Sequence, residues 1–337
     1  DVAMTWTAKK IVSQNDEEAP VGIEKLRAEG RFIPAQAIPI PEAEVFPAYI
    51  TTEDVVDAKG KPTGERRPVG YIRINTFSPC ADEELVLSQF RTTLRHFKEF
   101  GVKSVVLDLM DNGGGSVSLV YRLTQLLTAK TLKNHTIQYG TNENWIRDSL
   151  RGQQWGRSDS VREWMRRLAE QLLDSRAKGK RLTDPQAIEG LLPNMIEPNT
   201  ELADAEMDYV LLTSEMCASA ADMMASSLID NNLLGNINVY TVGAPTMGAG
   251  GNVVDHKNDQ APNSHFKVRM TESLMIRANG QYVENGQITP DKVLDVSMDR
   301  PIGFARLISQ VLKLGAQPTA LKTLIQQIGR ASCRERV

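Results

Sequence analysis

Three short segments of this sequence carry residue types that could do chemistry at a carbonyl group, and the first is a run of glycines. Residues 112–116 read Asn-Gly-Gly-Gly-Ser and follow an apolar stretch typical of a buried strand. Successive glycines let neighbouring backbone N–H groups turn toward one point, an arrangement that binds an oxyanion or a phosphate. The run lacks the lysine of a P-loop and the spacing of a dinucleotide-binding loop. A tight turn between a strand and a helix is an equally good interpretation.

The second segment, residues 215–222, lies between a predicted buried strand and a predicted helix. Ser219 is expected at the helix N-terminus, where free N–H groups and the helix dipole stabilise an alkoxide or a neighbouring oxyanion. Ser219 and Asp222 also have the spacing of a capping box, which many helices carry for stability alone. On this segment by itself, capping is the favoured interpretation. Cys217 is the rival nucleophile, although it precedes the helix and would point differently.

Two carboxylates complete the set of candidate residues. Glu284 precedes Asn-Gly within residues 282–286, and a solvated strand end is the default interpretation for it. Asp230 lies 230 − 219 = 11 residues after Ser219, three turns further along the same predicted helix. At 1.5 Å per residue the two lie about 16 Å apart along the axis, which makes direct contact implausible. We therefore expect Asp230 to be a supporting group that fixes the far end of the helix or its loop.

The elements that must position these residues follow a strand–helix–strand rhythm. Alternating or continuous apolar runs predict strands, and apolar positions three and four residues apart predict helices. The chain predicts strands over 69–77, 102–110, 207–213 and 237–242, further strands near 266–277, and helices that open at 82, follow 116, and cover 219–230 and 301–313. Such repeats imply a parallel sheet with right-handed crossovers, so the predicted fold class is α/β.

Residues 130–205 break this rhythm and predict a helical insertion. The insertion holds Trp145, Trp155 and Trp164. We expect these tryptophans to pack in its core rather than to line a ligand site, because one helix face carries apolar residues at helical spacing.

The predicted organisation has three parts. Residues 1–68 are interpreted as the remnant of an upstream domain with a linker, and residues 69–315 as the core with its insertion. Residues 316–337 are interpreted as a C-terminal helix followed by a non-native tail. A strand that begins at residue 1 suggests a chain cut from a longer protein.

Composition excludes several classes of protein. The chain has 337 residues with 39 basic and 42 acidic side chains, so its formal charge is 39 − 42 = −3, and 41% of it is apolar. This balance is that of an ordinary globular protein and argues against a nucleic-acid binder, which usually carries a basic excess. No apolar run in the sequence is long enough to span a membrane. Three distant cysteines, Cys80, Cys217 and Cys333, give neither a disulfide framework nor a metal site.

Taken together and in order, these segments resemble the C-terminal processing (tail-specific) serine peptidases, whose catalytic core has a ClpP/crotonase-like fold. The resemblance covers about residues 69–297. The strand that ends in Asn-Gly-Gly-Gly is similar to the family's Asn-Pro-Gly-Gly strand, and Ala-Ser-Ala-Ala-Asp at 218–222 is similar to its nucleophile motif. Asp230-Asn, the glycine turn at 243–251 and Ile-Thr-Pro-Asp at 288–291 follow at the family's spacing. Each motif is weak alone, whereas the ordered set is specific.

The resemblance implies a role for the candidate residues. Ser219 falls on the family's nucleophile. The backbone N–H of Ala220, with that of Gly114 or Gly115, is implied as the oxyanion hole. The catalytic lysine of the Ser–Lys members is replaced by Ala249, and a methyl group cannot act as a base.

The glycine turn Thr-x-Gly-Ala-Gly-Gly resembles instead the chlamydial protease-like activity factor branch of this family, which uses a Ser–His–Glu triad. The Ile-Glu-Asn of that branch is similar to Val-Glu-Asn here, which implies Glu284 as the third member. Surface or loop duty is expected for the four histidines, none of which falls on the branch's position: His96, His135, His256 and His265. We therefore expect the catalytic histidine upstream of residue 1, together with a PDZ-like domain.

The predicted function is that of a serine endopeptidase acting on a protein or peptide substrate. A first alternative is an inactive peptidase-like scaffold that binds peptides or protein C-termini without cleaving them, and Ala249 would be its sign. A second alternative, a crotonase-like acyl-CoA enzyme, shares the fold class but gives Ser219 no role. No metal and no organic cofactor is predicted. The resemblance implies an extracytoplasmic bacterial location, periplasmic or secreted, and a homodimer is compatible with it.

Overall fold

The computed structural model divides the chain into two compact units. It describes residues 37–40, 42–57, 61–156, 158–188, 192, 196–205, 207–256, 268–294 and 301–317. Unit 1 is drawn from 1–132, 197–247 and 288–337, and unit 2 from 133–196 and 248–287. Unit 2 therefore joins most of the predicted insertion with a second segment that begins inside the glycine turn, at residue 248. The predicted domain boundaries after residues 68 and 315 stay predictions.

A mixed sheet forms the centre of unit 1. Within the described part of this unit, seven strands lie in the order β1-β2-β3-β4-β7-β8-β12. They are β1 (Ile38–Pro39), β2 (Ala48–Val56), β3 (Pro62–Arg73), β4 (Ser104–Asp108), β7 (Asp208–Thr213), β8 (Asn238–Gly243) and β12 (Lys292–Val293). Strands β1, β2 and β3 pair antiparallel, and the pairs from β3 to β12 are all parallel. The predicted α/β class is confirmed.

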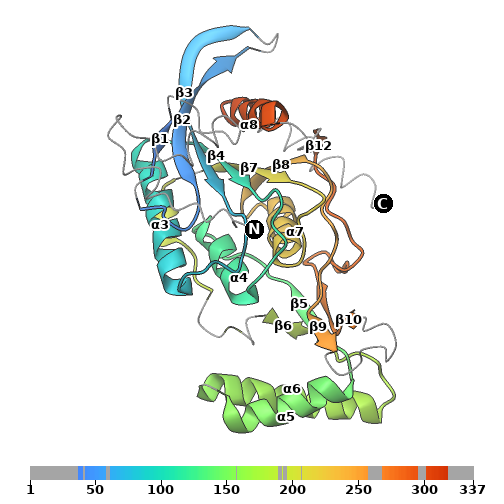
Figure 1. The fold of residues 1–337 in the computed structure, drawn as a ribbon. Coiled ribbons are helices and arrows are strands. Elements are labelled where there is room, and N and C mark those ends of the chain that lie inside the picture. The colour runs from blue at the N-terminus through green and yellow to red at the C-terminus, as the bar shows by residue number, and fades with distance from the viewer. Residues whose placement is uncertain are drawn as a thin grey trace. The chain divides into compact units, whose positions relative to one another are not determined.

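Helices cover both faces of this sheet (Figure 1). Helix α8 (Pro301–Gly315) packs on one face through Ile308, Val311 and Leu312, which join the core formed by the parallel strands. Helices α3 (Glu83–Glu99), α4 (Val117–Leu126) and α7 (Ala220–Leu233) lie on the other face (Figure 1), and a short 3₁₀ helix spans Thr200–Leu202. Two completely buried strands, β4 and β7, account for the continuous apolar runs in the sequence.

Local signals in the sequence set the ends of α3. The Asp82 carboxylate accepts hydrogen bonds from the N–H groups of Glu84 and Leu85, so the predicted helix start is confirmed. At the other end Gly101 adopts φ +69°, a conformation that favours glycine after a helix.

Unit 2 contains a helical hairpin and two small sheets. Helices α5 (Glu143–Trp155) and α6 (Asp159–Ala177) confirm the predicted helical character of this segment. Among the described residues of unit 2, one sheet has the order β11-β5-β6, formed by Ser273–Ile276, Thr136–Tyr139 and Gln186–Ala187. The other pairs β9 (Val253–His256) with β10 (Val268–Thr271). Strands β10 and β11 fall where the sequence predicted strands, near residues 266–277.

The tryptophans of unit 2 divide between core and surface. Trp145 and Trp164 meet the ring of Tyr139 edge-on, with ring centroids 4.7 and 6.1 Å apart. Trp155 is 82% exposed, so the prediction that it packs in the core is wrong. Across the described ranges, no helix is both long and apolar enough to cross a lipid bilayer.

Candidate active site

The loops that follow β4, β7 and β8 meet at one edge of the unit 1 sheet. These three strands are parallel neighbours, so their carboxyl ends lie side by side, where α/β proteins place their sites. The Ala218 N–H donates to the Asn112 carbonyl at 3.0 Å, which ties the second loop to the first. The Met247 N–H donates to the Cys217 carbonyl at 2.8 Å, which ties the third loop to the second.

Ser219 occupies a strained turn at the start of α7. Its backbone has φ 55° and ψ −118°, the conformation of the first central residue of a type II′ turn, where glycine is usual. The turn is closed by the Ala221 N–H, which donates to the Ala218 carbonyl at 3.0 Å. A non-glycine residue held this way costs roughly 1–3 kcal/mol and occurs mainly at functional sites.

The Ser219 side chain does not cap the helix, although Ser219 stands at the N-cap position. The capping interpretation favoured on the sequence is therefore wrong. The residue is half-buried, while Ala220 and Asp222 beside it are fully buried. A serine hydroxyl presented on a tight strand-to-helix turn is the arrangement that nucleophile elbows use.

The glycine loop lies directly against Ser219. Gly114 has φ +102°, and a Cβ atom placed there would lie 2.6 Å from Ser219 Cβ and 2.8 Å from the Ala218 carbonyl oxygen. Gly115 has φ +141°, and a Cβ atom there would lie 2.4 Å from the Phe77 carbonyl carbon. Both positions therefore require glycine, for conformation and for space.

The two glycines differ in what their N–H groups do. The Gly114 N–H donates to Asn112 Oδ1 at 2.9 Å and is thus engaged within its own loop. Among the described residues, the N–H groups of Gly115 and Ala220 donate no hydrogen bond. The amide of Gly115, rather than that of Gly114, is therefore the one left for a ligand.

Asn112 holds this edge together, a role that sequence reasoning did not assign. Its side chain is completely buried, and its Nδ2 donates to the Ile74 carbonyl at 2.8 Å. Its Oδ1 accepts from Gly114, and its own carbonyl accepts from Ala218. A buried asparagine between a strand and a glycine run was the available signal.

A buried polar cluster at the end of β4 holds the start of the glycine loop. The Asp108 carboxylate, fully buried at the end of β4, accepts from Tyr71 Oη at 2.5 Å and from the Met110 N–H at 2.9 Å. Arg73 Nη1 lies 3.5 Å from Asp108, and Arg73 Nη2 lies 3.6 Å from Asp111. Burial, followed by the Asp108 charge, raises the pKa of Tyr71 well above its usual value, so the phenol stays a donor. These bonds fix where the glycine loop begins.

Replacing Gly114 with alanine is expected to remove at least roughly 100-fold of any activity that depends on Ser219, because the new methyl group must displace the nucleophile turn. Hydrolysis rates of a peptide substrate by the full-length protein measure this. Gly64→Ala is the control, since Gly64 also has a positive φ, +84°, but has open space around its Cα. Equal effects of the two substitutions would show that conformation, not contact with Ser219, decides the outcome.

Cys217 does not qualify as the nucleophile. The side chain is completely buried, its thiol donates to the Leu109 carbonyl at 2.9 Å, and its sulfur accepts from the Ser214 N–H at 3.3 Å. Burial raises the pKa of the Cys217 thiol to about 12. The thiolate, which is the reactive form, is therefore scarce at neutral pH.

Alkylation separates the two described cysteines. At pH 8 we expect iodoacetamide to modify Cys80, which is exposed, and to leave Cys217 unmodified until the protein unfolds. Peptide mass mapping before and after denaturation is the measurement. Modification of Cys217 at a rate similar to that of Cys80 in the folded protein would contradict this placement.

Glu284, in unit 2, is held by a glycine turn. Its side chain is half-buried, Oε2 accepts from the Gly250 N–H at 2.9 Å, and Oε1 accepts from Thr271 Oγ1 at 3.3 Å. Asn285, with φ 57°, donates its N–H to the Gly248 carbonyl at 2.7 Å. The carboxylate is thus oriented, and the solvated strand end expected by default is not what the structure shows.

Ala249 lies between the two glycines that hold this loop, Gly248 and Gly250. Ala249 therefore stands in the same turn that holds the Glu284 carboxylate.

The candidate residues thus belong to two different units. In unit 1 it brings Gly114, Ser219 and Ala220 together, and places Asp230 three turns along α7, at 3% exposure. Glu284 belongs to unit 2, where Gly250 and Thr271 hold its carboxylate.

The described histidines have other partners. His96 Nε2 lies 3.1 Å from Glu42 Oε2, on the surface as expected. His135 lies in a loop, in agreement with the expected surface or loop duty, and is 2% exposed. Burial and the Arg277 charge lower the pKa of His135 to about 3, which keeps it neutral. The side chains of His256 and His265 lie outside the described residues.

Comparison with known proteins identifies relatives of the whole core. The profile of Peptidase family S41 matches residues 68–294. A protein of Chlamydia trachomatis serovar D is 27% identical over 321 residues, covering 85% of this chain and 50% of that protein. An uncharacterized protein of Chlamydia muridarum matches with the same identity and coverage. The chain therefore spans about half the length of the curated relatives it matches.

Solved structures share the fold. The crystal structure of mature CPAF matches with a TM-score of 0.63 at 24% identity, covering 88% of this chain and 58% of that one. The structure of mature CPAF complexed with lactacystin matches with a TM-score of 0.60, again at 24% identity, covering 83% and 55% of the two chains. These likenesses support the predicted architecture.

Proposed function

This chain belongs to peptidase family S41, and from that premise we propose that it acts as a serine endopeptidase with Ser219 as the nucleophile. One observation carries the proposal: Ser219 is held in a strained turn at the start of α7, its side chain does not cap the helix, and Gly114 packs against it. A helix that only needed a cap would not require this conformation.

The proposed reaction follows from these positions. Ser219 Oγ attacks the scissile carbonyl carbon and passes its proton to a histidine, which then protonates the leaving amine. Water hydrolyses the acyl-enzyme with the same base and restores Ser219. The free N–H groups of Ala220 and Gly115 are the proposed donors to the oxyanion. Glu284, already oriented by Gly250, is proposed to hold the imidazole in the correct tautomer.

The proposed base is a histidine outside the described side chains. His96 is engaged with Glu42 and Glu99, and His135 is buried and neutral. The chain spans about half the length of the curated relatives it matches, so the experiments use the full-length protein.

A fluorophosphonate probe tests the proposal directly. The full-length protein should be labelled at Ser219, as located by peptide mass mapping, and labelling should vanish in Ser219→Ala. The probe needs no knowledge of the natural substrate. An intact, folded protein that takes no label at Ser219 would refute the assignment.

Ala249 favours one second candidate, an inactive scaffold that binds peptides or protein C-termini. The same experiment separates the two, because a scaffold would bind a peptide ligand without becoming labelled at Ser219.

We further propose an extracytoplasmic location and a homodimer, both supported by the family resemblance. Fractionation of the native organism's cells checks the first, and light scattering of the purified full-length protein checks the second.

A further inference from the structure

We propose that the groove along α5 and α6 in unit 2 is a docking surface for an acidic amphipathic helix of a protein partner. The proposal does not rest on the proposed activity, because binding can be measured without cleavage. The first observation is that few side chains of α5 are buried. In this helix Ser149 alone is classed as buried, although the sequence is strongly amphipathic.

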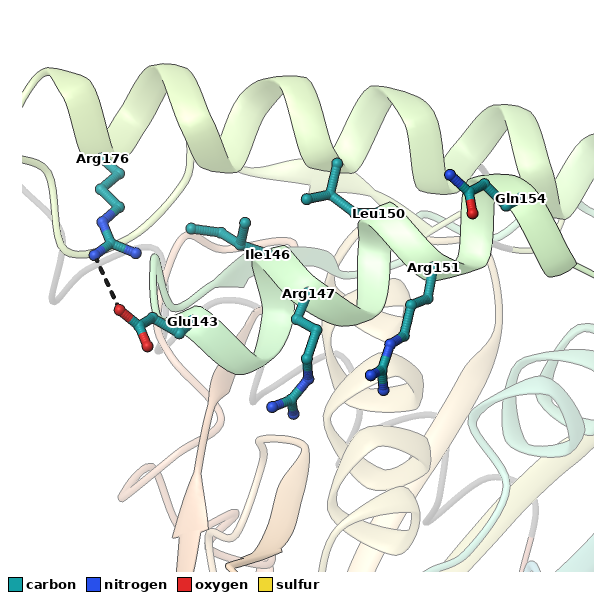
Figure 2. Close-up of a pocket in the computed structure, with 7 residues that line it drawn as sticks. All are labelled: Glu143, Ile146, Arg147, Leu150, Arg151, Gln154 and Arg176. Atoms are coloured by element: carbon teal, nitrogen blue, oxygen red, sulfur yellow. Dashed lines mark hydrogen bonds and ion pairs between the residues drawn. The ribbon is translucent and has the colours of Figure 1, made fainter.

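The inward face of α5 is made by small or anchored residues. A Cβ atom at Gly152 would lie 2.6 Å from Met165 Cγ on α6, so the helices approach closely there. Trp145 Nε1 donates to the Glu272 carbonyl at 3.1 Å and fixes the start of the helix. Ile146 and Leu150 also lie toward α6 (Figure 2), yet Leu150 stays 40% exposed.

Two parallel stripes of side chains run along α5 beside this contact. Ile146, Leu150 and Gln154 recur every four residues, and Arg147 and Arg151 form a second stripe one position on. With Glu143 and Arg176 these residues line an open groove of about 340 Å³ along α5 and α6 (Figure 2). Figure 2 shows Arg147 and Arg151 extending in one direction while Ile146 and Leu150 lie toward α6. Leu150 is 40% exposed.

The charges of the hairpin are balanced differently on its two helices. On α6, Arg166 pairs with Glu163 at 2.8 Å and with Glu170 at 2.5 Å, so its charge is met within the helix. On α5, Arg151 has no hydrogen bond or ion pair with any described residue.

The neighbours of Arg151 in the groove hold their partners loosely. Arg176 reaches Glu143 at 3.4 Å and Arg147 reaches Asp148 at 3.3 Å, both between exposed side chains. Arg147 also donates to the neutral Asn144 Oδ1 at 3.0 Å. Exposed pairs of this kind contribute little and exchange readily for a better-placed carboxylate.

These observations identify the occupant. Apolar residues at four-residue spacing match the apolar stripe of a second helix, and arginine guanidinium groups beside them match carboxylates on its flank. The groove lining carries three arginines against the single acidic residue Glu143, which favours an acidic partner. The helical spacing of its apolar residues favours a protein helix over an anionic membrane or a nucleic acid. Trp155, 82% exposed at the end of α5, adds a residue type enriched at binding hot spots.

The test uses a fluorescent, amidated helical peptide of about 16 residues. It carries leucines on one stripe and glutamates on the next, and its counterpart has lysines in place of the glutamates. Fluorescence anisotropy with the full-length protein should show binding of the glutamate peptide and not of the lysine peptide. Leu150→Ser and Arg151→Glu should each weaken binding by roughly 10-fold.

Matched controls lie on α3 of unit 1. Leu85 is 49% exposed and Arg91 is exposed, so Leu85→Ser and Arg91→Glu make the same chemical changes away from the groove and should leave binding unchanged. Circular dichroism confirms that all four variants fold. Absence of binding, equal loss in both pairs, or residue-dependent binding of phosphatidylserine-containing vesicles in place of the peptide would each overturn the proposal.

Discussion

Ser219→Ala is expected to lower the rate of peptide hydrolysis by the full-length protein by roughly 10⁴-fold or more, because no other described group can form the acyl-enzyme. Cys217, the nearest alternative nucleophile, is buried with its thiol bonded to Leu109. Folding should be preserved, because the Ser219 side chain does not cap α7 and its loss removes no helix-capping bond.

Ser116→Ala is the matched control for this substitution. Ser116 also stands at a helix N-cap, but its Oγ accepts from the Leu119 N–H at 3.2 Å and donates to Glu83 Oε1 at 2.5 Å. Its loss should cost about 1 kcal/mol of stability with little change in rate. Ser219→Ala variants that keep more than a tenth of the rate would contradict the nucleophile assignment.

Glu284→Gln is expected to lower kcat by about 10³- to 10⁴-fold with little change in KM, the effect of leaving a catalytic histidine in the wrong tautomer. The amide can still accept from Gly250 or Thr271, so the loop should keep its shape. Steady-state kinetics of the full-length protein separate kcat from KM.

Glu215→Gln gives the control for loss of one carboxylate. Glu215 lies four residues before Ser219 and is exposed, so its substitution tests whether charge near the nucleophile loop matters by itself. We expect less than a two- to threefold change. A similar loss of kcat in both variants, or an unchanged kcat in Glu284→Gln, would remove Glu284 from the proposed triad.

The elements of unit 1 were predictable because their signals are local. Asp82 caps α3 as its position indicated, and the apolar runs of β4 and β7 are buried on both sides. Such patterns depend on neighbours in the sequence and on one buried face. The start of β3 moved from the predicted residue 69 to Pro62, because the strand pairs with β2 as far as Val56.

The site was harder to predict because its geometry depends on distant contacts. The spacing of Ser219 and Asp222 is the same in a capping box and in a nucleophile turn. What distinguishes them is φ at Ser219, which is set by the approach of Gly114 about a hundred residues earlier in the chain. Asn112 similarly joins Ile74, Gly114 and Ala218, a set that no sequence window contains.

Burial was also misjudged where packing overrides composition. His135, for which surface or loop duty was expected, lies in a loop but is buried and neutral near Arg277. Trp155 was expected in the core and is exposed. In both cases the side chain's surroundings come from segments that the local pattern does not reveal.

The alternation of the chain between the two units has a consequence for how the protein is made. Unit 2 needs residues 133–196 and 248–287, and strand β5 pairs with β11, in which Ser273 meets Tyr139 across 273 − 139 = 134 residues. At a synthesis rate of about 5–20 residues per second, β11 is made at least several seconds after β5. During that time the edge of β5 that pairs with β11 has no partner strand. Strand pairings this far apart also close slowly. The nascent chain therefore carries an open strand edge through much of translation, which makes it a natural client for chaperones.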